Sequence, residues 1–342
     1  MSQWSIAPVA SAAEWDAFAE RQPGFTHFHR IGWRDVIGRA FGHECLYLEA
    51  RSPAGALGGV LPLVRVRSAL FGHYLVSMPF LNYGGPLGDP GAVRALADGA
   101  AARAAADGAK LLELRSEVEL PLDLPVSHRK ITVLLDLAAD RDGLWKGFSS
   151  KLRSQIRKPQ KEGVEVRFGA DQVDPFFQVF ARHMRDLGTP VLPRRWFAEI
   201  AARFGDQVWF AAAWHQGRPV AGGVAFRWND EIEITWASSL VEANKIAPNM
   251  LLYCAMMERG IAEGARTFNF GRCTPGSGTH RFKSQWGGRD QPLWWYQWTP
   301  GGRAASTPSP DQGAFSWGPR VWQRLPLPVA NAIGPRIVRY LP

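Results

Sequence analysis

The amino-acid sequence predicts an α+β fold in which two related lobes each carry a mixed sheet flanked by helices. Three observations predict this fold. The chain has 342 residues, which is enough for about two domains. The same order of expected strands and a helix occurs twice along the chain. In addition, no expected strand is followed by the Gly-x-Gly-x-x-Gly motif that binds dinucleotides. A doubly wound sheet is therefore not expected.

The first copy of the repeated succession lies in the N-terminal half of the chain. A turn leads into an apolar strand over residues 55–63, and a helix is expected over 93–107. Gly-Ala-Lys and a further strand follow at 108–115. Hairpin strands that precede a helix in this way are typical of an α+β lobe.

The second copy has the same order. A turn and an apolar strand occupy residues 217–226, a helix is expected over 249–263, and Gly-Ala-Arg leads into a strand over 264–272. The helix has clear boundary signals, because Pro248 stands at its start and Gly264 at its end. We therefore expect two copies of one mixed α/β unit.

Composition between and after the two copies sets the expected domain boundaries. The polar, basic stretch after residue 139 is interpreted as the start of the second lobe, which gives lobes at 1–139 and 140–299. Turn-forming residues after Trp298 and several prolines near the C-terminus predict a Pro-rich linker and short helical tail over 300–342. This tail either packs across the lobes or lies on an anionic bilayer.

The overall composition restricts the kind of protein. A net charge of +9 suits an anionic partner such as a nucleotide sugar, a tRNA or an acidic membrane surface, although it also fits an arginine-rich genome. Three scattered cysteines form neither a disulfide framework nor a metal spacing. We expect a cytoplasmic protein, soluble or peripheral at the inner face of the membrane, without a bound cofactor, a metal or a DNA partner.

A basic segment at residues 150–161 predicts a helix with one anion-binding side. Arg153 and Arg157 are one helical turn apart, so their guanidinium groups suit two oxygens of a pyrophosphate. A solvated basic surface is the alternative. Ser149 or Ser150 is expected to cap the helix, and Pro159 is expected to end or kink it.

The segment 268–288 combines turn residues, cations and aromatic residues and is interpreted as a wall of a substrate cleft. A strand over its first residues is followed by a glycine-rich loop, and the next stretch is either a strand or a helix. Both alternatives place Phe282 with Trp286 and direct Lys283 elsewhere. A nucleophilic Cys273 activated by His280 is a competing interpretation of the same loop.

Five long segments resemble a known family. They are FNFGRCTPGSGTHRFKSQWGG, KLRSQIRK followed by KEG, MRDLGTPV, the run from Trp236 to Tyr253, and LVSMPFLNYGG. Together they closely resemble FemAB-like proteins associated with exosortase (PEP-CTERM) systems, in the FemABX branch of the GNAT acyltransferase superfamily. The resemblance extends from about Trp33 to Trp298. It implies tandem GNAT-like lobes, in agreement with the repeat.

The resemblance also implies an activity. Classical Fem enzymes transfer an amino acid from aminoacyl-tRNA to the amine of a peptidoglycan precursor, and a Phe-Lys pair followed by an aromatic residue and a glycine lies at their active cleft. Here that motif corresponds to Phe282, Lys283, Trp286 and Gly287. Lys283, together with Arg281, is thereby implied to polarise the acyl carbonyl and stabilise the oxyanion.

The residues expected to bind substrate come from three parts of the chain. They are Phe282, Trp286, Arg272, Thr274, Arg153, Arg157, Asn249 and Tyr253. Asn269 and Cys273 replace the Asp and Ser usual in the family, so neither a carboxylate base nor a serine nucleophile is assumed there.

The acyl donor stays open between aminoacyl-tRNA and acyl-CoA. The loop before the second helix reads EANKIAPN and lacks the pyrophosphate motif of CoA-dependent GNAT enzymes, and no heptad segment resembles the helical arm of classical Fem enzymes. We expect an acyl- or aminoacyltransferase acting on a small-molecule or lipid-linked glycan precursor of the cell envelope or an exopolysaccharide. The alternative is a non-catalytic module that binds an anionic glycan or lipid-linked intermediate.

Overall fold

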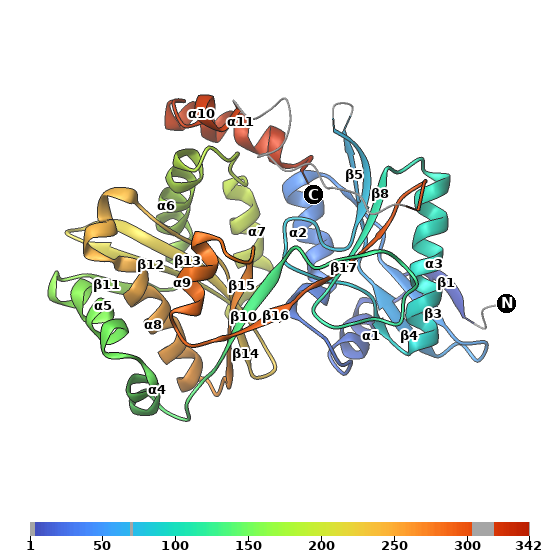
Figure 1. The fold of residues 1–342 in the computed structure, drawn as a ribbon. Helices are drawn as coiled ribbons and strands as arrows, with labels where there is room; N and C mark the ends of the chain where they lie inside the picture. The colour runs from blue at the N-terminus through green and yellow to red at the C-terminus, as the bar shows by residue number, and fades with distance from the viewer. Residues whose placement is uncertain (1–3, 69–70, 303–317, 342) are drawn as a thin grey trace. The chain divides into compact units, whose positions relative to one another are not determined.

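The structure is a computed structural model that describes residues 4–68, 71–302 and 318–341 (Figure 1). These residues form mixed sheets flanked by helices, which confirms the predicted α+β class. They divide into two compact units. Unit 1 comprises the described residues within Met1–Lys130, Pro292–Pro308 and Arg339–Pro342, and unit 2 those within Ile131–Gln291 and Ser309–Val338.

Unit 1 contains a four-stranded sheet of order β1-β3-β4-β7 and a six-stranded sheet of order β2-β5-β6-β8-β17-β9. The strands are β1 (Ser5–Pro8), β2 (Glu44–Cys45), β3 (Leu48–Arg51), β4 (Leu57–Leu61), β5 (Val64–Ser68), β6 (Gly72–Val76), β7 (Leu87–Gly88), β8 (Leu111–Ser116), β9 (Val126–Ser127) and β17 (Trp294–Trp298). The helices are α1 (Ala12–Ala19), η1 (His27–His29), α2 (Gly32–Phe41) and α3 (Pro90–Ala106).

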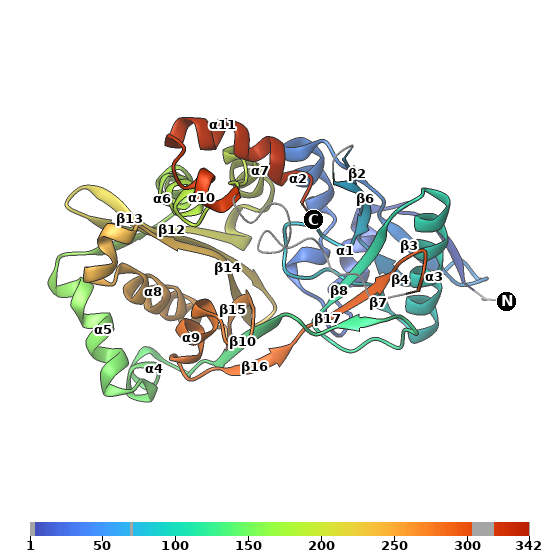
Figure 2. The ribbon, with the colours of Figure 1, turned by 45° about the horizontal axis from the view of Figure 1, so that its top comes forward.

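Unit 2 contains a seven-stranded sheet of order β11-β12-β13-β14-β15-β10-β16. Its strands are β10 (Ile131–Asp136), β11 (Glu165–Phe168), β12 (Val208–His215), β13 (Arg218–Trp228), β14 (Glu231–Ser239), β15 (Thr267–Cys273) and β16 (Arg289–Pro292). Its helices are α4 (Arg141–Gly147), α5 (Ser150–Lys161), η2 (Ala170–Gln172), α6 (Val173–Asp186), α7 (Arg194–Phe204), η3 (Gly205–Gln207), η4 (Val241–Ile246), α8 (Pro248–Ala262), α9 (Gly278–Ser284), α10 (Gly318–Trp322) and α11 (Leu327–Val338). Helices α6, α7 and α11 lie on one side of the sheet, and α5 and α8 on the other (Figure 2).

The predicted repeat is present in both units. In unit 1, β6 and β8 run parallel and are joined through α3, and in unit 2, β14 and β15 run parallel and are joined through α8. A parallel pair requires such a crossover, which the repeated strand, helix and strand pattern supplies. The elements expected over residues 93–107 and 249–263 are therefore confirmed as α3 and α8.

Glycines in each copy allow helices to approach the sheet closely. A Cβ atom on Gly59 of β4 would lie 2.9 Å from the Ala92 Cβ of α3. A Cβ atom on Gly222 of β13 would lie 3.2 Å from the Phe176 Cα of α6, and one on Gly223 would lie 3.1 Å from Met256 of α8. A larger residue at Gly59 or Gly222 would press against the Cβ or Cα atoms of a helix, whereas at Gly223 it would displace the flexible end of the Met256 side chain.

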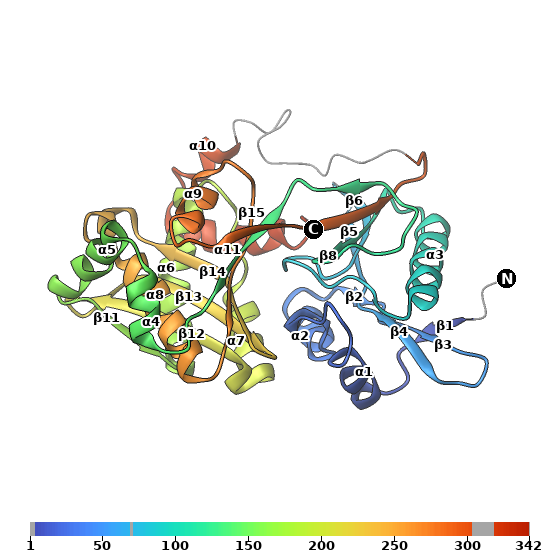
Figure 3. The same ribbon diagram turned by 60° about the horizontal axis from the view of Figure 1, so that its bottom comes forward.

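One strand in each unit comes from a distant part of the chain. Strand β10 directly follows unit 1 in sequence and pairs antiparallel with β15 of unit 2, whereas β17 follows unit 2 and pairs antiparallel with β8 of unit 1 (Figure 3). The boundaries expected at residues 139 and 299 assign β10 to the first lobe and β17 to the second. In the structure, β10 belongs to unit 2 and β17 to unit 1. Pairing between distant strands leaves no local signal in the sequence.

Two expectations about prolines have different outcomes. Pro159 was expected to end or kink the basic helix near Lys158; the expected end is wrong, because α5 continues to Lys161 with Pro159 buried in its last turn. The short helices expected near the C-terminus are present as α10 and α11. Much of the predicted linker lies outside the described residues. Within the described part of the chain, none of the helices has the length and apolar character needed to span a bilayer.

Candidate functional site

The candidate site lies in unit 2, where β14 and β15 separate. The two parallel strands pair only from Glu231 with Thr267 to Glu233 with Asn269. Both strands continue beyond this point, β14 to Ser239 and β15 to Cys273. The backbone groups of the diverging segments are therefore not joined to each other, and side chains from α8 and α9 lie beside them.

Lys283 is the buried cation of this site. It is carried by the short helix α9, whose first turn is capped by the Ser277 hydroxyl as it accepts from the His280 N–H at 3.1 Å. The Lys283 side chain is 4% exposed, and its Nζ donates to the carbonyl oxygens of Gly271 at 2.6 Å and Arg272 at 3.0 Å. These hydrogen bonds fix the ammonium against β15.

The electrostatic surroundings of Lys283 act in opposite directions. Burial lowers the pKa of Lys283 from 10.5 to about 8, while Cys273 and the Glu233 carboxylate favour the charged form. Because the desolvation effect is larger, the pKa of Lys283 stays below its ordinary value. Such a perturbed cation is a common property of a catalytic site, although a structural lysine also shows it.

Three polar residues, Asn269, Glu231 and Glu233, lie beside the point where β14 and β15 separate. The sequence analysis did not identify them as a group. Asn269 accepts from the Thr132 hydroxyl and from the Gly271 N–H at 2.8 Å, and it donates to Glu231 Oε1 at 2.8 Å. Burial raises the pKa of Glu231 to about 7 despite the Asn269 hydrogen bond. Glu233 is fully buried and accepts from the Thr235 hydroxyl at 2.7 Å. The signal that could have revealed the two glutamates is their alternation with apolar residues in strand β14.

The aromatic residues expected to bind substrate form one cluster. The Tyr253 ring of α8 lies 5.7 Å from Phe270, 5.0 Å from Phe282 and 5.9 Å from Trp286. Tyr253 and Trp286 are buried, whereas Phe282 is half-buried. The structure thus brings three expected residues together, with Phe282 the most accessible. The stretch after residue 278 is helical, and Lys283 is directed away from Phe282 as both alternatives required.

The two expected catalytic cations have different surroundings. Arg281 is exposed, and its guanidinium donates to the Gly276 carbonyl oxygen at 2.9 Å, so it stabilises the turn before α9. Lys283 is buried on another side of the same helix. Arg272 is half-buried and Thr274 is exposed in the segment that leads to this turn. The structure does not bring Arg281 to the Lys283 ammonium.

Asn249 lies at the start of α8. Its Nδ2 donates to the Ser239 hydroxyl at 3.0 Å, and its buried Oδ1 has no hydrogen-bond partner among the described residues. Ala247 precedes the helix with a φ of 53°, and no side chain caps the first turn. The preceding loop forms the short helix η4 in place of a glycine-rich phosphate loop.

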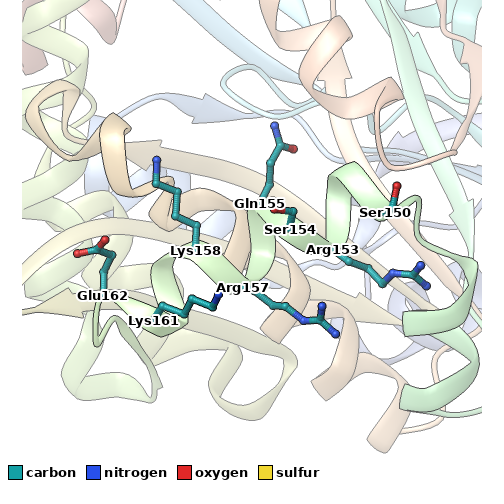
Figure 4. A pocket seen from close by; sticks show the side chains of 8 residues that line it. All are labelled: Ser150, Arg153, Ser154, Gln155, Arg157, Lys158, Lys161 and Glu162. Carbon is teal, nitrogen blue, oxygen red and sulfur yellow. The ribbon is translucent and has the colours of Figure 1, made fainter.

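Arg153 and Arg157 of α5 both lie beside Trp145. The Arg157 guanidinium lies 5.0 Å above the Trp145 ring, and Arg153 NH1 donates to the Trp145 carbonyl oxygen at 3.4 Å. Figure 4 shows both side chains extending in the same direction from α5, with Lys158 extending away from them. A hollow of about 470 Å³ lies along this helix. Its lining residues are Ser150, Arg153, Ser154, Gln155, Arg157, Lys158, Lys161 and Glu162.

The competing interpretation of Cys273 lacks its expected base. His280 accepts from the Gly276 N–H through Nδ1 at 3.0 Å and contacts Asp290 through Nε2 at 2.9 Å, so both ring nitrogens are occupied elsewhere. Cys273 is buried. Among the described residues, no group of His, Cys, Asp and Glu has the arrangement of a metal site.

Comparisons with known proteins show similarity to GNAT domains and to an aminoacyltransferase. The Acetyltransferase (GNAT) domain family matches residues 146–284, a range that contains α5, α8, both diverging strands and Lys283. A segment of 104 residues is 28% identical to the UDP-N-acetylmuramoylpentapeptide-lysine N(6)-alanyltransferase of Weissella viridescens. That segment covers 30% of this chain and 31% of the relative.

Two solved structures extend the similarity to most of the chain. The crystal structure of FemX has a TM-score of 0.64 and 15% identity, and the alignment covers 85% of this chain and 97% of FemX. A tandem GNAT protein from the clavulanic acid biosynthesis pathway has a TM-score of 0.52 and 13% identity, with 89% of this chain and all of that chain covered. The fold is thus GNAT-like and similar to FemX. Together with the domain match and the alanyltransferase relative, these findings support an acyltransferase.

Proposed function

We propose that this protein transfers an aminoacyl or acyl group to an amine of a cell-envelope precursor, with Lys283 as the cation that stabilises the reacting carbonyl. One observation carries the proposal: a buried ammonium, held by β15 carbonyls, lies where β14 and β15 separate within a GNAT-type domain. The relative from Weissella viridescens supports an aminoacyl group and a peptidoglycan precursor as first candidates.

The proposed reaction needs no side-chain nucleophile. The acceptor nitrogen attacks the acyl carbon and forms a C–N bond, and the C–O bond of an aminoacyl ester, or the C–S bond of a thioester, breaks. The nitrogen loses a proton, and the departing oxygen or sulfur gains one. Negative charge develops on the carbonyl oxygen, where an ammonium in a water-poor site is most effective.

The charged state of Lys283 is part of the proposal. Protonation of a buried amine costs free energy, but the fixed carbonyl partners and the nearby Glu233 carboxylate partly offset that cost. With a pKa of about 8, most Lys283 side chains carry the charge at neutral pH. The cation is therefore present before the acyl group arrives, which avoids reorganisation during the reaction.

We propose that the α5 hollow binds the anionic part of a substrate. Arg153 and Arg157 are oriented by Trp145, so their guanidinium groups are arranged in advance for phosphate oxygens. Lys158 and Lys161 add positive charge to the same hollow. A pyrophosphate of a nucleotide sugar or lipid-linked precursor has matching chemistry, and the phosphates of an aminoacyl-tRNA donor are the alternative.

The proposal is tested by assaying the purified full chain with two donors, alanyl-tRNA and acetyl-CoA, against a panel of acceptors. The panel contains UDP-N-acetylmuramoyl-pentapeptide, its lipid-linked form and lipid-linked exopolysaccharide precursors, because the sequence resembles proteins of exosortase systems. Product is identified by mass spectrometry. Lys283→Met is expected to lower transfer several hundredfold with the fold intact, and Lys110→Met is the control, since it removes an exposed lysine of unit 1. Absence of product with every donor and acceptor pair would refute the proposal.

A second candidate function is a non-catalytic module that binds an anionic glycan or lipid-linked intermediate. The hydrogen bonds from Lys283 to two backbone carbonyls favour it, because a lysine that only joins α9 to β15 would make the same contacts. In that case an Arg153→Ala and Arg157→Ala double variant loses affinity for the precursor, while no donor is consumed by the wild-type protein. Calorimetric titration combined with the transfer assay separates the two functions.

A further inference from the structure

The C-terminal helices α10 and α11 have an apolar surface that the transfer reaction does not use. On α11, the exposed residues are Pro328, Val329, Ala332, Ile333 and Arg336. Their spacing places them on one side of the helix, and four of the five are apolar. Val329 and Ile333 are each 39% exposed, and Val321 of α10 is 49% exposed. A helix that only packs on its own domain normally presents polar residues on this side.

The opposite side of α11 is firmly attached to unit 2. Ala330 and Gly334 are buried, and a Cβ atom on Gly334 would lie 2.9 Å from the Val191 backbone nitrogen. Helix α11 packs against α6, and Arg185 of α6 donates to the Leu325 carbonyl oxygen at 3.2 Å between α10 and α11. The apolar side thus faces solvent because of how the helix is held.

The C-terminal segment that carries this apolar side is also positively charged. Residues 318–341 contain four arginines and neither aspartate nor glutamate. Arg320, Arg324 and Arg336 are exposed, and none of them forms an ion pair with another residue that the structure describes. Gly188 packs closely on α10, since a Cβ atom on it would lie 2.7 Å from Pro319. The preceding residue, Leu187, is 55% exposed and adds an apolar side chain next to this contact. Apolar residues flanked by unpaired arginines define what we call the α11 surface, made of Val321, Val329, Ala332, Ile333, Arg320, Arg324 and Arg336.

We propose that the α11 surface docks on an anionic lipid bilayer. Val329, Ala332 and Ile333 enter the boundary between headgroups and acyl chains, and the arginines contact anionic headgroups on either side. This inference goes beyond the proposed transfer reaction and does not depend on it. The charges select a bilayer over a second copy of the chain, since a two-fold dimer through this surface would bring three arginines against three arginines.

The test is co-sedimentation of the full chain with two kinds of vesicle, one of phosphatidylcholine alone and one that also contains about 30 mol% phosphatidylglycerol as the anionic lipid. We expect binding to the anionic vesicles only. Replacement of Arg320, Arg324 and Arg336 by Gln is expected to weaken binding by about 100-fold, because each arginine near the surface contributes roughly a factor of five.

The apolar contribution is tested separately by the Val329→Ser and Ile333→Ser double variant, which is expected to weaken binding by at least about tenfold. Val118→Ser is the matched control, because Val118 is also 39% exposed but lies in unit 1. Circular dichroism verifies that the fold is kept. Equal binding of wild type to neutral and anionic vesicles, unchanged binding of the serine variant, or an α11-dependent dimer without vesicle binding would each overturn the proposal.

Discussion

Unit 1 and unit 2 share a parallel strand pair joined by a helix, but the two pairs differ beyond their last paired residues. In unit 1, the Ser77 N–H donates to the Glu113 carbonyl oxygen at 2.9 Å, and the Ser77 hydroxyl accepts from the Arg115 N–H at 2.7 Å. Ser77 therefore bridges β6 and β8 one residue beyond the paired segment. In unit 2, the pairing of β14 with β15 ends at Glu233 and Asn269.

The buried cations of the two units also differ, because one is hydrogen-bonded to a carboxylate and the other to backbone carbonyls. Arg115 donates through Nε to Glu113 Oε1 at 2.8 Å and lies 4.5 Å from the Trp295 ring, so its charge is neutralised within unit 1. Lys283 of unit 2 is hydrogen-bonded to neutral carbonyl oxygens, and burial lowers its pKa to about 8. One copy of the repeat thus has a closed ion pair, and the other has a buried ammonium that is hydrogen-bonded to backbone carbonyls and that we propose to interact with a substrate carbonyl.

The largest expected effect is the loss of stability when the ion pair of unit 1 is broken. Arg115→Met leaves the Glu113 carboxylate buried with Gln297 as its remaining charge-stabilising donor. An uncompensated buried charge costs about 3–5 kcal/mol, so the free energy of unfolding is expected to fall by this amount in urea denaturation.

The double variant Glu113→Gln and Arg115→Met is the control for that prediction. It removes both charges and keeps an amide near Gln297, so it is expected to recover at least half of the lost stability. Equal destabilisation by the single and double variants would show that packing of the Arg115 side chain, rather than its charge, stabilises unit 1.

The next effect is on catalysis in unit 2. Lys283→Met is expected to raise the activation barrier by about 3–4 kcal/mol, a loss of several hundredfold in kcat/KM, because the oxyanion loses its cation. Stability should change much less than in Arg115→Met, since loss of the two carbonyl hydrogen bonds is offset by removal of a desolvated charge. A stability loss similar to that of Arg115→Met would make Lys283 a structural residue.

The pH dependence of the wild type provides a further check on Lys283. The folded pKa of about 8 lies below the unfolded value of 10.5, so the unfolded chain binds more protons between these pH values. Stability should therefore rise with pH from about 8 to 10.5, and this rise should be absent in Lys283→Met. The transfer rate should fall as pH rises through about 8, because the charged form is lost. A rate that increases through this range would contradict the role of the ammonium.

Much of the fold was accessible from the sequence because its signals are local. Proline and glycine at the ends of α8, and the alternating residues of β15, predict those elements correctly. The segment of α9 stayed ambiguous, because seven residues fit both a strand and two helical turns. β10 pairs with β15, and β17 pairs with β8, although the partners are far apart in the sequence. No local sequence pattern predicts such long-range pairing.

The candidate site was only partly accessible for a related reason. Helical spacing was enough to bring Arg153 and Arg157 together, and the same argument placed Phe282 beside Trp286. Burial and hydrogen bonding decide between Lys283 and Arg281, and both depend on how α9 rests on β15. Glu233 belongs to a strand far from α9 in the sequence, so its proximity to Lys283 required the tertiary structure.

A smaller expected effect concerns a carboxylate of each unit. The pKa of Glu231 is raised from 4.5 to about 7, so the folded chain binds more protons in this range and stability falls as pH rises through it. Glu231→Gln keeps an acceptor for Asn269 and should be more stable than the wild type by about 1–3 kcal/mol above pH 7, but not below pH 4.5. Glu113→Gln of unit 1 should instead destabilise, because Arg115 loses its partner. Denaturation at about pH 4 and pH 8 measures both, and a destabilised Glu231→Gln at the higher pH would contradict the comparison.

The smallest expected effect compares two helix caps. Ser277 caps α9 through the His280 N–H at 3.1 Å, and Ser11 caps α1 of unit 1 through the Glu14 N–H at 3.3 Å. Replacing either serine by alanine is expected to cost about 1 kcal/mol of stability in denaturant unfolding. Only Ser277→Ala should also lower kcat/KM, by about two- to fivefold, because α9 carries Lys283 and a frayed first turn loosens its contact with β15. Equal activity of the two variants would mean that the carbonyl hydrogen bonds alone position the ammonium, whereas an equal loss in both would point to a general effect of stability on turnover.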